Sequence, residues 1–358
     1  MLMAAGQPTK MTKTSILQKL EASGLTGRGG GGFSVFKKWE LVESNLKDKA
    51  SGYIIVNGAE GEPEVKKDAY LLDKETSLVI EGINLALSFL GKNKIKTVYF
   101  YLNYDYEKLY KKKIEQVLAS KKYFSLAKKV KFFTKPLSSG YIGGEESAIL
   151  NIIEGKRACP RLRPPFPVES GLFQSPTLIH NIETFYSIAL VSQNKYQNKR
   201  LYTLSGSCRH KGVYSLDANL SIDDVLHSTD NYPDFPFFVI SGGSVCGEVL
   251  DSSQLSASVE GSGLIMIFDH LKTDYDKLLN YWLKYYEAES CGLCTPCREG
   301  SYRLKEIIED KKLDVNKFQA LLDNLEVSTF CALGSSLPVT VKSYLENIYF
   351  KYQKNGKF

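Results

Sequence analysis

Residues 27–39 read Gly27-Arg28-Gly29-Gly30-Gly31-Gly32-Phe33-Ser34-Val35-Phe36-Lys37-Lys38-Trp39. Five of the first six residues are glycine, and glycine lets a ligand approach the main chain closely. Such a run can direct several backbone N–H groups at one anion, as phosphate-binding loops do. Arg28 and Lys38 add cationic donors, and Phe33 and Trp39 add flat apolar surfaces. The stretch therefore predicts a loop that holds a phosphate together with a planar ring.

A flexible linker is the alternative interpretation of this glycine-rich loop. Linkers, however, are usually rich in both glycine and serine, and they lack a rim of aromatic and cationic side chains. The loop is also not a G-x-G-x-x-G sequence after a strand, so the ordinary dinucleotide-binding fingerprint fits it poorly.

The composition of the whole chain is that of a soluble globular protein. It has 358 residues, of which 43% are hydrophobic and 24% charged, which suggests two or three domains. No apolar run approaches the roughly 18 residues of a membrane span, and no secretion leader is recognised. We expect a cytoplasmic protein without direct membrane insertion, either free or peripheral on the cytoplasmic face of a membrane complex.

The charge of the chain does not indicate nucleic-acid binding. The net charge of +6 is mild for this length, and the lysines are dispersed, with the highest density in residues 108–135. A solvated face explains this pattern, and a basic docking face for an acidic partner remains open.

Strands and helices alternate after the glycine-rich loop. Residues 52–57, 95–102 and 130–133 read as strands, and the segments 68–90 and 105–119 between them have helical spacing. This alternation predicts a parallel α/β layer structure.

The first strand runs into a loop with two carboxylates, Asn57-Gly58-Ala59-Glu60-Gly61-Glu62-Pro63. Loops after strands are where α/β folds place ligand groups. An ordinary acidic turn is the alternative.

A second glycine-containing stretch, residues 140–148, leads into a predicted helix that continues to about Glu154. Glycines before a helix N-terminus form another site that can receive an anion. Glu145 and Glu146 could equally serve only to stabilise the helix dipole. Residues 161–167 then form a stiff basic loop that carries Phe166, and residues 180–184 open another helix.

The chain changes character after residue 198. Residues 199–270 contain strand-like stretches at 201–205, 237–241 and 263–268 and one short helix near 222–227, which indicates a small α+β domain. A helical region begins at Leu271 and continues with interruptions to Lys351.

The chain has seven cysteines, and Cys291, Cys294 and Cys297 have the spacing C-x₂-C-x₂-C. Three ligands on so short a loop suit a cubane iron–sulfur cluster, and a distant cysteine such as Cys331 can supply the fourth ligand. Zinc sites more often pair two C-x₂-C units, so zinc, or no metal at all, are the weaker alternatives. The other cysteines stand singly, and we expect them to be core thiols: Cys159, Cys208 and Cys246.

Together these motifs resemble the NADH-binding flavoprotein subunit of respiratory complex I, the 51 kDa-type family that includes related subunits of NAD-linked hydrogenases and formate dehydrogenases. The resemblance runs from about residue 24 to 345 and rests on residues 27–33, 57–63, 141–146, 164–171 and 289–298. It implies three domains. They are an α/β FMN- and NADH-binding domain with a Rossmann-like parallel sheet (1–198), a small α+β ubiquitin-like β-grasp domain (199–270), and an all-α helical bundle with one [4Fe–4S] cluster (271–358).

The resemblance also implies roles for individual residues. FMN contacts are expected at Gly27, Arg28, Gly29, Gly30, Lys38, Asn57, Glu60, Gly144, Glu145, His180, Asn181 and Thr184. NADH contacts are expected at Phe33, Glu62, Glu146, Arg163 and Phe166, with Glu146 orienting the nicotinamide as the residue closest to a catalytic role. The cluster ligands are expected to be Cys291, Cys294, Cys297 and Cys331.

Three positions depart from the family pattern. An acidic flavin contact is replaced by Ala59, the first of two paired asparagines by His180, and an aromatic wall of the adenine pocket by Leu41. The form Asn-Gly-Ala-Glu-x-Glu-Pro is similar to that of sodium-pumping ferredoxin:NAD oxidoreductase subunits.

The implied activity is that of an NADH dehydrogenase: NADH reduces FMN, and single electrons pass to the cluster and on to an iron–sulfur partner subunit. An electron-relay or assembly subunit without productive NADH binding, or a ferredoxin:NAD oxidoreductase-type subunit, is the alternative.

Overall fold

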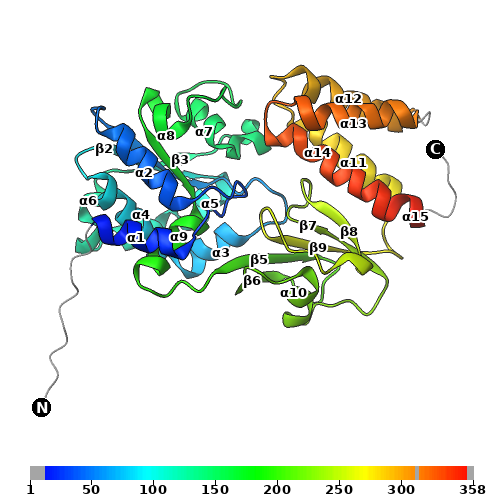
Figure 1. Cartoon of the computed structure of the whole chain (residues 1–358), viewed down its shortest axis with the longest axis horizontal. Coiled ribbons are helices and arrows are strands. Elements are labelled where there is room, and N and C mark those ends of the chain that lie inside the picture. Colours follow the sequence, from blue (N-terminus) through cyan, green and yellow to red (C-terminus); the bar gives the residue numbers. More distant parts are fainter. Residues whose placement is uncertain (1–12, 311–313, 353–358) are drawn as a thin grey trace, which may run out of the picture.

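The computed structural model describes residues 13–310 and 314–352 (Figure 1). Its first part is built on a parallel four-stranded sheet in the order β3-β2-β1-β4. The predicted parallel α/β structure is thus confirmed, although β4 was not anticipated from the sequence. The strands are β1 (Gly52–Gly58), β2 (Ile95–Leu102), β3 (Val130–Thr134) and β4 (Thr177–Asn181).

Both faces of this sheet are buried, as is usual for parallel sheets. Ile54 and Val56 of β1 pack into the larger core with α2, α4 and α9, whereas Tyr53 and Ile55 pack on the other face with α7. The helices of this part are α1 (Lys13–Ser23), α2 (Val35–Leu46), α3 (Lys67–Lys74), α4 (Thr76–Leu90), α5 (Tyr104–Leu118), α6 (Phe124–Ala127), α7 (Glu146–Ile153), α8 (Pro167–Ser170) and α9 (Ile182–Ser192).

The strand order reverses direction between β1 and β4. From β1 the chain moves outward through β2 to β3, and it then returns to place β4 on the other side of β1. Asn57 at the end of β1 pairs with Asn181 at the end of β4. Open parallel sheets bind ligands at such a reversal, beyond the carboxyl ends of the strands, so the fold itself marks this edge as the place for a site.

A second sheet has five strands in the order β6-β5-β9-β7-β8, and only β5 and β9 pair in parallel. Three of its strands and its helix match the sequence prediction, whereas β6 and β8 were not anticipated. Its elements are β5 (Lys199–Gly206), β6 (Gly212–Asp217), α10 (Ile222–Ser228), β7 (Phe237–Ser241), β8 (Glu248–Asp251) and β9 (Leu264–Asp269).

Helices fill the C-terminal part of the chain, as predicted, and lie beside the second sheet (Figure 1). One core joins them to it, because Phe238 and Ile240 of β7 pack with Trp282 and Tyr344. Among the described residues no helix has the length and apolarity that crossing a bilayer requires. The helices are α11 (Tyr275–Glu289), α12 (Thr295–Glu309), α13 (Val315–Ser328), α14 (Ala332–Tyr344) and α15 (Phe350–Tyr352).

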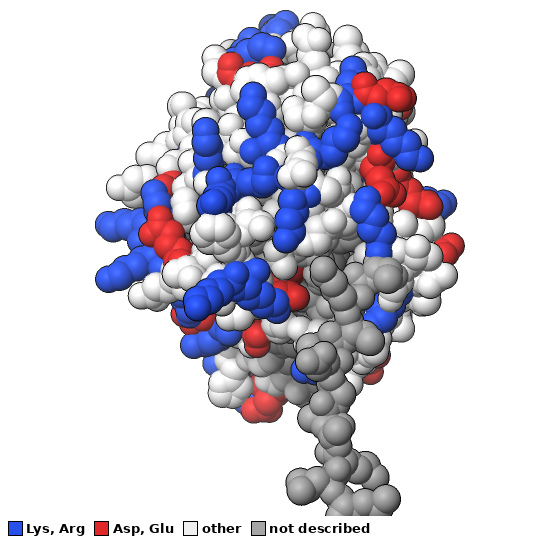
Figure 2. All heavy atoms as spheres, turned by 90° about the vertical axis from the view of Figure 1, so that its left-hand side faces the viewer, with Lys and Arg blue, Asp and Glu red and all other residues white. Residues whose placement is uncertain are grey.

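Lysines and arginines gather on the end of the molecule where α6 lies (Figure 2). The exposed Lys92 lies in the turn before β2, and Lys121 and Lys122 lie in a short 3₁₀ helix that precedes α6 and β3, so all three come before the amino ends of these strands. This basic face is therefore at the opposite end of the strands from the sheet reversal.

Candidate functional site

The glycine-rich loop leaves its main chain open. A bridge between Thr26 and Ser34 closes the base of the loop, and Gly27 donates to the Phe33 carbonyl over 2.8 Å. Gly30 and Gly32 have φ angles of 100° and 59°, which side chains other than glycine rarely adopt. A Cβ added at either position would meet no atom within 4 Å. The loop thus has the open, glycine-lined backbone that a phosphate group requires.

Two contacts dock this loop against the sheet reversal. The Arg28 N–H donates to Thr184 Oγ1 over 2.9 Å, and a Cβ at Gly29 would lie 3.2 Å from the Cβ of Asn181. Both partners belong to the start of α9 or the residue that caps it. The loop is therefore brought to the edge where β1 and β4 end.

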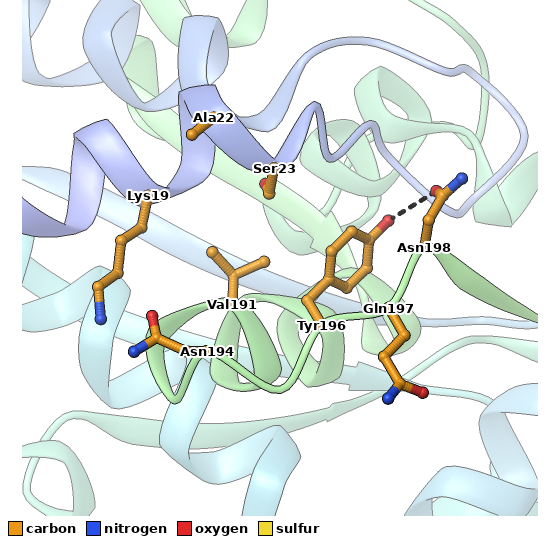
Figure 3. A pocket seen from close by; sticks show the side chains of 8 residues that line it. All are labelled: Lys19, Ala22, Ser23, Val191, Asn194, Tyr196, Gln197 and Asn198. Carbon is orange, nitrogen blue, oxygen red and sulfur yellow. Dashed lines mark hydrogen bonds between the residues drawn. The ribbon is translucent and has the colours of Figure 1, made fainter.

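The Arg28 side chain leaves the loop and donates to the Tyr196 hydroxyl over 2.6 Å. Tyr196 in turn donates to Asn198 Oδ1 over 3.3 Å, and both line a cavity of about 430 Å³ (Figure 3). The other lining residues come from α1, the end of α9 and the segment that follows α9: Lys19, Ala22, Ser23, Val191, Asn194 and Gln197. Arg28 thus anchors the loop through its side chain.

The ends of β1 and β4 form the floor of the site. Asn57 donates to the Gly144 carbonyl over 3.0 Å and accepts from the Ala59 N–H over 3.1 Å, while Asn181 donates to the Asn57 carbonyl over 3.3 Å. A Cβ at Gly144 would lie 3.3 Å from the Cβ of Ala59. The stretch before α7 therefore rests directly on the loop after β1.

The start of α7 carries two carboxylates with different surroundings. Glu145 caps the helix by accepting from the N–H groups of Ser147 and Ala148 over 3.0 and 2.8 Å. Arg163 forms an ion pair with Glu145 and another, at 3.3 Å, with Glu146. Glu146 also pairs with Lys38 over 3.1 Å. The structural role that the sequence left open for Glu145 is thus present, and Glu146 is joined to the helix that follows the glycine-rich loop.

A buried charge network lies under this floor. Lys67 is 4% exposed, and its ammonium is 3.3 Å from Asp68, 3.0 Å from Glu183 and 3.0 Å from Asn181 Oδ1. Burial alone would lower the pKa of Lys67, but the carboxylates of Asp68, Glu183 and Glu60 raise it. Because one cation faces several carboxylates, the network holds more acidic groups than it can keep charged.

Among these acidic groups, Glu60 has a clearly raised pKa. It accepts from the Asp68 N–H over 2.8 Å and from the Tyr106 hydroxyl. Burial, followed by the neighbouring charge of Asp68, raises the pKa of Glu60 to about 8. The carboxyl group therefore titrates near neutral pH at a position expected to contact flavin.

His180 is held as a neutral imidazole. The Trp39 indole N–H donates to His180 Nε2 over 3.1 Å, so that nitrogen carries no proton. Burial, with a smaller effect from the charge of Lys38, lowers the pKa of His180 well below its usual value. This environment fits a satisfied structural histidine better than a proton relay.

The residues expected to contact NADH differ in accessibility. Phe33 and Phe166 are 48% and 47% exposed, so their rings are available to a ligand. Glu62 is 9% exposed, and its carboxylate accepts from the Val245 N–H over 3.0 Å. Part of its acceptor capacity is therefore already used within the protein.

Cys294 and Cys331 occupy the N-cap positions of α12 and α14 without a side-chain capping hydrogen bond, and the four expected cluster ligands are close enough to influence one another electrostatically. Burial raises the pKa of Cys297 to about 11, and the thiols of Cys294, Cys331 and Cys291 add to the shift. Within residues 13–310 and 314–352, no three His, Cys, Asp or Glu side chains converge as a single-metal site would need. An all-thiol donor set gathered from two segments matches the ligation of iron–sulfur clusters.

The cysteine loop also touches the first part of the chain. Arg157, just after α7, donates to the Cys291 carbonyl. Glu289, two residues before that cysteine, accepts from the Tyr141 N–H. The two candidate sites are therefore joined by direct contacts.

Comparisons with known proteins agree with this geometry. The family model described as the Nuo51 FMN-binding domain matches residues 20–190, and that of the NADH-ubiquinone oxidoreductase-F iron-sulfur binding region matches residues 277–355. The F 2 subunit of the NADH-quinone oxidoreductase of Rhizobium meliloti is 30% identical, with 94% of this chain and 87% of the relative covered. The chain belongs to the NADH-quinone oxidoreductase F-subunit family. It therefore has the FMN-binding and iron–sulfur regions of this family.

Other F-subunit relatives are similar over almost the whole chain. The NADH-quinone oxidoreductase F subunit of Aquifex aeolicus is 27% identical, with 97% of this chain and 87% of the relative covered. The HndC subunit of the NADP-reducing hydrogenase of Solidesulfovibrio fructosivorans is also 27% identical, with coverage of 96% and 76%. A crystal structure of an NAD+-reducing [NiFe]-hydrogenase superposes with a TM-score of 0.84 at 26% identity, over 98% of this chain but only 64% of the hydrogenase chain.

Several residues that shape this F-subunit site were not predicted from the sequence. Lys67, Asp68 and Glu183 were not singled out, and neither was Tyr106. The pair Lys67-Asp68 sits at the start of a helix directly after the loop that holds Glu60, and that adjacency is the one signal that could have drawn attention to it. The ligand contacts predicted for individual residues stay predictions.

Proposed function

We propose that this chain is the electron-input subunit of a larger redox complex, accepting electrons from NADH through FMN and passing them to a [4Fe–4S] cluster. When bound, FMN takes up two electrons together and gives them up singly, which is chemistry that no side chain supplies. The residues of the chain bind and orient the cofactor and the nucleotide, and they exclude water from the site.

One observation carries this proposal. The short stretch Tyr141–Gly144 touches both candidate sites: the Gly144 carbonyl accepts from Asn57 at the sheet reversal, and the Tyr141 N–H donates to Glu289 beside the cysteine loop. A single turn of backbone thus spans the flavin site and the cluster site, as transfer between them requires.

We propose that the chain has three domains, with the flavin site in the first and the cluster site in the third. The proposed boundaries are 1–198, 199–270 and 271–358. The second sheet supports a ubiquitin-like β-grasp assignment, because its first and last strands, β5 and β9, pair in parallel at the centre of a mixed sheet. One helix, α10, follows the first hairpin, as that fold requires.

Within the first domain we assign the flavin phosphate to the open glycine-rich loop and the ring system to the floor formed by Asn57, Gly144 and Asn181. We assign to Glu146 the orientation of the nicotinamide, and its ion pairs with Lys38 and Arg163 hold the carboxylate in position. The exposed rings of Phe33 and Phe166 offer flat surfaces for adenine.

Electrons must leave the cluster to another protein, which we propose is an iron–sulfur subunit. Exposed apolar side chains flank the cysteines in sequence: Leu293 is 44% exposed, Phe330 37% and Val327 84%. Exposed apolar groups that gather in this way mark interaction surfaces. The docking surface is therefore expected around the cysteine loop.

The test is anaerobic purification followed by spectroscopy. We expect flavin absorbance, iron and acid-labile sulfide in the protein, bleaching of the flavin by NADH, and an electron paramagnetic resonance signal from the reduced cluster. Flavin-loaded protein that saturating NADH does not bleach would contradict the proposal.

The relay alternative is favoured by one observation. Ala59 is 2% exposed and offers no polar group where the family places a carboxylate. If dithionite reduces the cluster but NADH does not, and Phe33→Ala leaves the activity of the assembled complex unchanged, the relay function replaces NADH oxidation. Reduction of the flavin by reduced ferredoxin alone would instead indicate a ferredoxin:NAD oxidoreductase-type subunit.

A further inference from the structure

The loop between β7 and β8, residues 242–247, lies where all three parts of the chain meet. It belongs to the second sheet, faces Glu62 of the first part, and contacts α11 and α14 behind it. Figure 1 shows the β7–β8 hairpin between the parallel sheet and the C-terminal helices. No sequence motif drew attention to this loop.

On one side, the loop forms hydrogen bonds with the segment Glu62-Pro63. The Val245 N–H donates to Glu62 Oε1 over 3.0 Å, and the Cys246 thiol donates to Glu62 Oε2 over 3.1 Å. The Ser244 hydroxyl lies 2.8 Å from the Pro63 carbonyl and 3.4 Å from Glu62 Oε1, so the carbonyl is its better acceptor. Each oxygen of the Glu62 carboxylate therefore has a donor from this loop.

The approach of the two segments is close enough to require glycine. A Cβ at Gly243 would lie 2.7 Å from Glu62 Oε1 and 2.5 Å from Cys246 Sγ. Burial, with the neighbouring charge of Glu62, raises the pKa of the Cys246 thiol. The thiol thus keeps its proton and stays a donor to the carboxylate.

The back of the loop is fixed by the helices that carry the cluster cysteines. Trp282 donates to the Ser244 carbonyl over 3.0 Å, and Tyr286 donates to the Val245 carbonyl over 3.0 Å. Thr340 lies 2.9 Å from the Val245 carbonyl and 2.7 Å from the Gly247 carbonyl. Since α11 leads to Cys291 and α14 follows Cys331, the loop is braced by the same helices that position the cluster.

We propose that Cys246 is a positioning residue for NADH: its thiol holds one oxygen of the Glu62 carboxylate so that the remaining acceptor capacity faces a nucleotide ribose. This inference rests on the proposed function, because it requires that Glu62 contacts NADH. An ionised carboxylate accepts about four hydrogen bonds, and the loop leaves some of them free. The second sheet thereby contributes a wall of the nucleotide site.

The experiment compares Cys246→Ala, Cys246→Ser and the control Cys208→Ala in the flavin-loaded protein. Cys208 is a half-buried cysteine in the loop between β5 and β6 of the same sheet, and it packs against a different core. NADH affinity is measured by anaerobic titration of flavin bleaching, and NAD+ affinity by equilibrium dialysis. We expect Cys246→Ala to weaken both about fivefold, because the thiol is a weak donor to a charged acceptor. Cys246→Ser should stay within about twofold of the parent, kcat at saturating NADH should be unchanged, and Cys208→Ala should match the parent.

A second readout uses the parent protein and does not depend on the folding of a variant. The S–H stretching bands of the protein are recorded by infrared difference spectroscopy, with and without NAD+. Ribose hydroxyls that donate to Glu62 would weaken the carboxylate as the acceptor of the Cys246 thiol, so we expect NAD+ to shift one S–H band to higher frequency and to leave the band of Cys208 in place.

Two results would overturn the inference: unchanged nucleotide affinity in a folded Cys246→Ala protein, or S–H bands that NAD+ leaves in place. A Cys246→Ala protein with a lower melting temperature but unchanged nucleotide affinity would also overturn the inference, since it would show that the thiol has a structural role only. Failure of the proposed function itself is distinguishable, because the parent protein would then neither bleach with NADH nor bind NAD+.

Discussion

Glu289 accepts a hydrogen bond from the main-chain N–H of Tyr141, and this bond joins the last residue of α11 to the turn Tyr141–Gly144 before α7. The fit is tight, because a Cβ at Gly140 would collide with the Glu289 carboxylate. Arg157 adds a second bond to the Cys291 carbonyl. These bonds hold the stretch before α7 against the cysteine loop, so in the proposed function they fix the spacing of the flavin and cluster sites.

Glu289→Ala should slow the transfer of electrons from flavin to cluster without affecting flavin reduction. Removal of the carboxylate leaves the Tyr141 N–H without its partner and loosens the cysteine loop against the first part of the chain. We expect cluster reduction to fall several-fold while flavin bleaching by NADH keeps its rate, as measured by stopped-flow absorbance and freeze-quench spectroscopy. Glu287→Ala is the matched control, since Glu287 lies on the same helix as Glu289 but pairs with Lys305 of α12. Equal effects of the two substitutions would contradict this account.

Lys67→Met should destabilise the protein strongly. The substitution removes the only cation among the described residues that pairs with Asp68 or Glu183. Breaking a buried ion pair from one side costs about 3–5 kcal/mol, and we expect a loss of that size in the free energy of unfolding measured with urea. Lys74→Met, which removes an exposed pair with Asp73, should leave the unfolding free energy nearly unchanged.

Glu60→Gln should flatten the pH dependence of stability. The pKa of Glu60 is raised from 4.5 to about 8 in the folded protein. Between these two values the folded state keeps a proton that the unfolded state releases, so stability falls as pH rises through this window. Glutamine mimics the protonated carboxyl group and removes this contribution.

The measurement for Glu60 is the melting temperature from pH 5 to pH 8.5 in excess FMN. The difference between Glu60→Gln and the parent should become more favourable to the variant as pH rises. Glu64→Gln, two residues beyond Glu62 in the same loop, is the control and should run parallel to the parent. Parallel curves for Glu60→Gln as well would show that Glu60 is ionised throughout this range.

Most of the first sheet and the helices could be predicted from the sequence, because the hydrophobic pattern of each element lies within its own residues. Strand Ile95–Leu102 follows from the apolar, largely aromatic run at residues 98–102 within it. Strand β4 was missed because its five residues merge into the start of α9. Edge strands β6 and β8 are short or half exposed, so their hydrophobic pattern is weak.

The candidate site was predictable only where a motif carries its own chemistry. The glycine run indicates a phosphate-binding loop, and the C-x₂-C-x₂-C spacing indicates a metal cluster, each within a few consecutive residues. Lys67 meets Glu183 across 116 positions, and Cys246 meets Glu62 across 184. Such pairs depend on how distant segments of the chain pack together, which no local pattern records.

Gly31→Ala tests whether the glycine-rich loop binds the flavin phosphate. A Cβ at Gly31 would meet no protein atom within 4 Å, and its φ is not in the left-handed region, so the folded protein without flavin should keep its melting temperature. A bound phosphate, in contrast, needs the close backbone approach that only glycine allows. We therefore expect FMN affinity, measured by quenching of flavin fluorescence, to fall at least tenfold. Gly24→Ala, outside the loop, is strained at its φ of 61° and should lower the melting temperature without a comparable loss of FMN affinity. Unchanged FMN affinity in Gly31→Ala would move the phosphate site away from this loop.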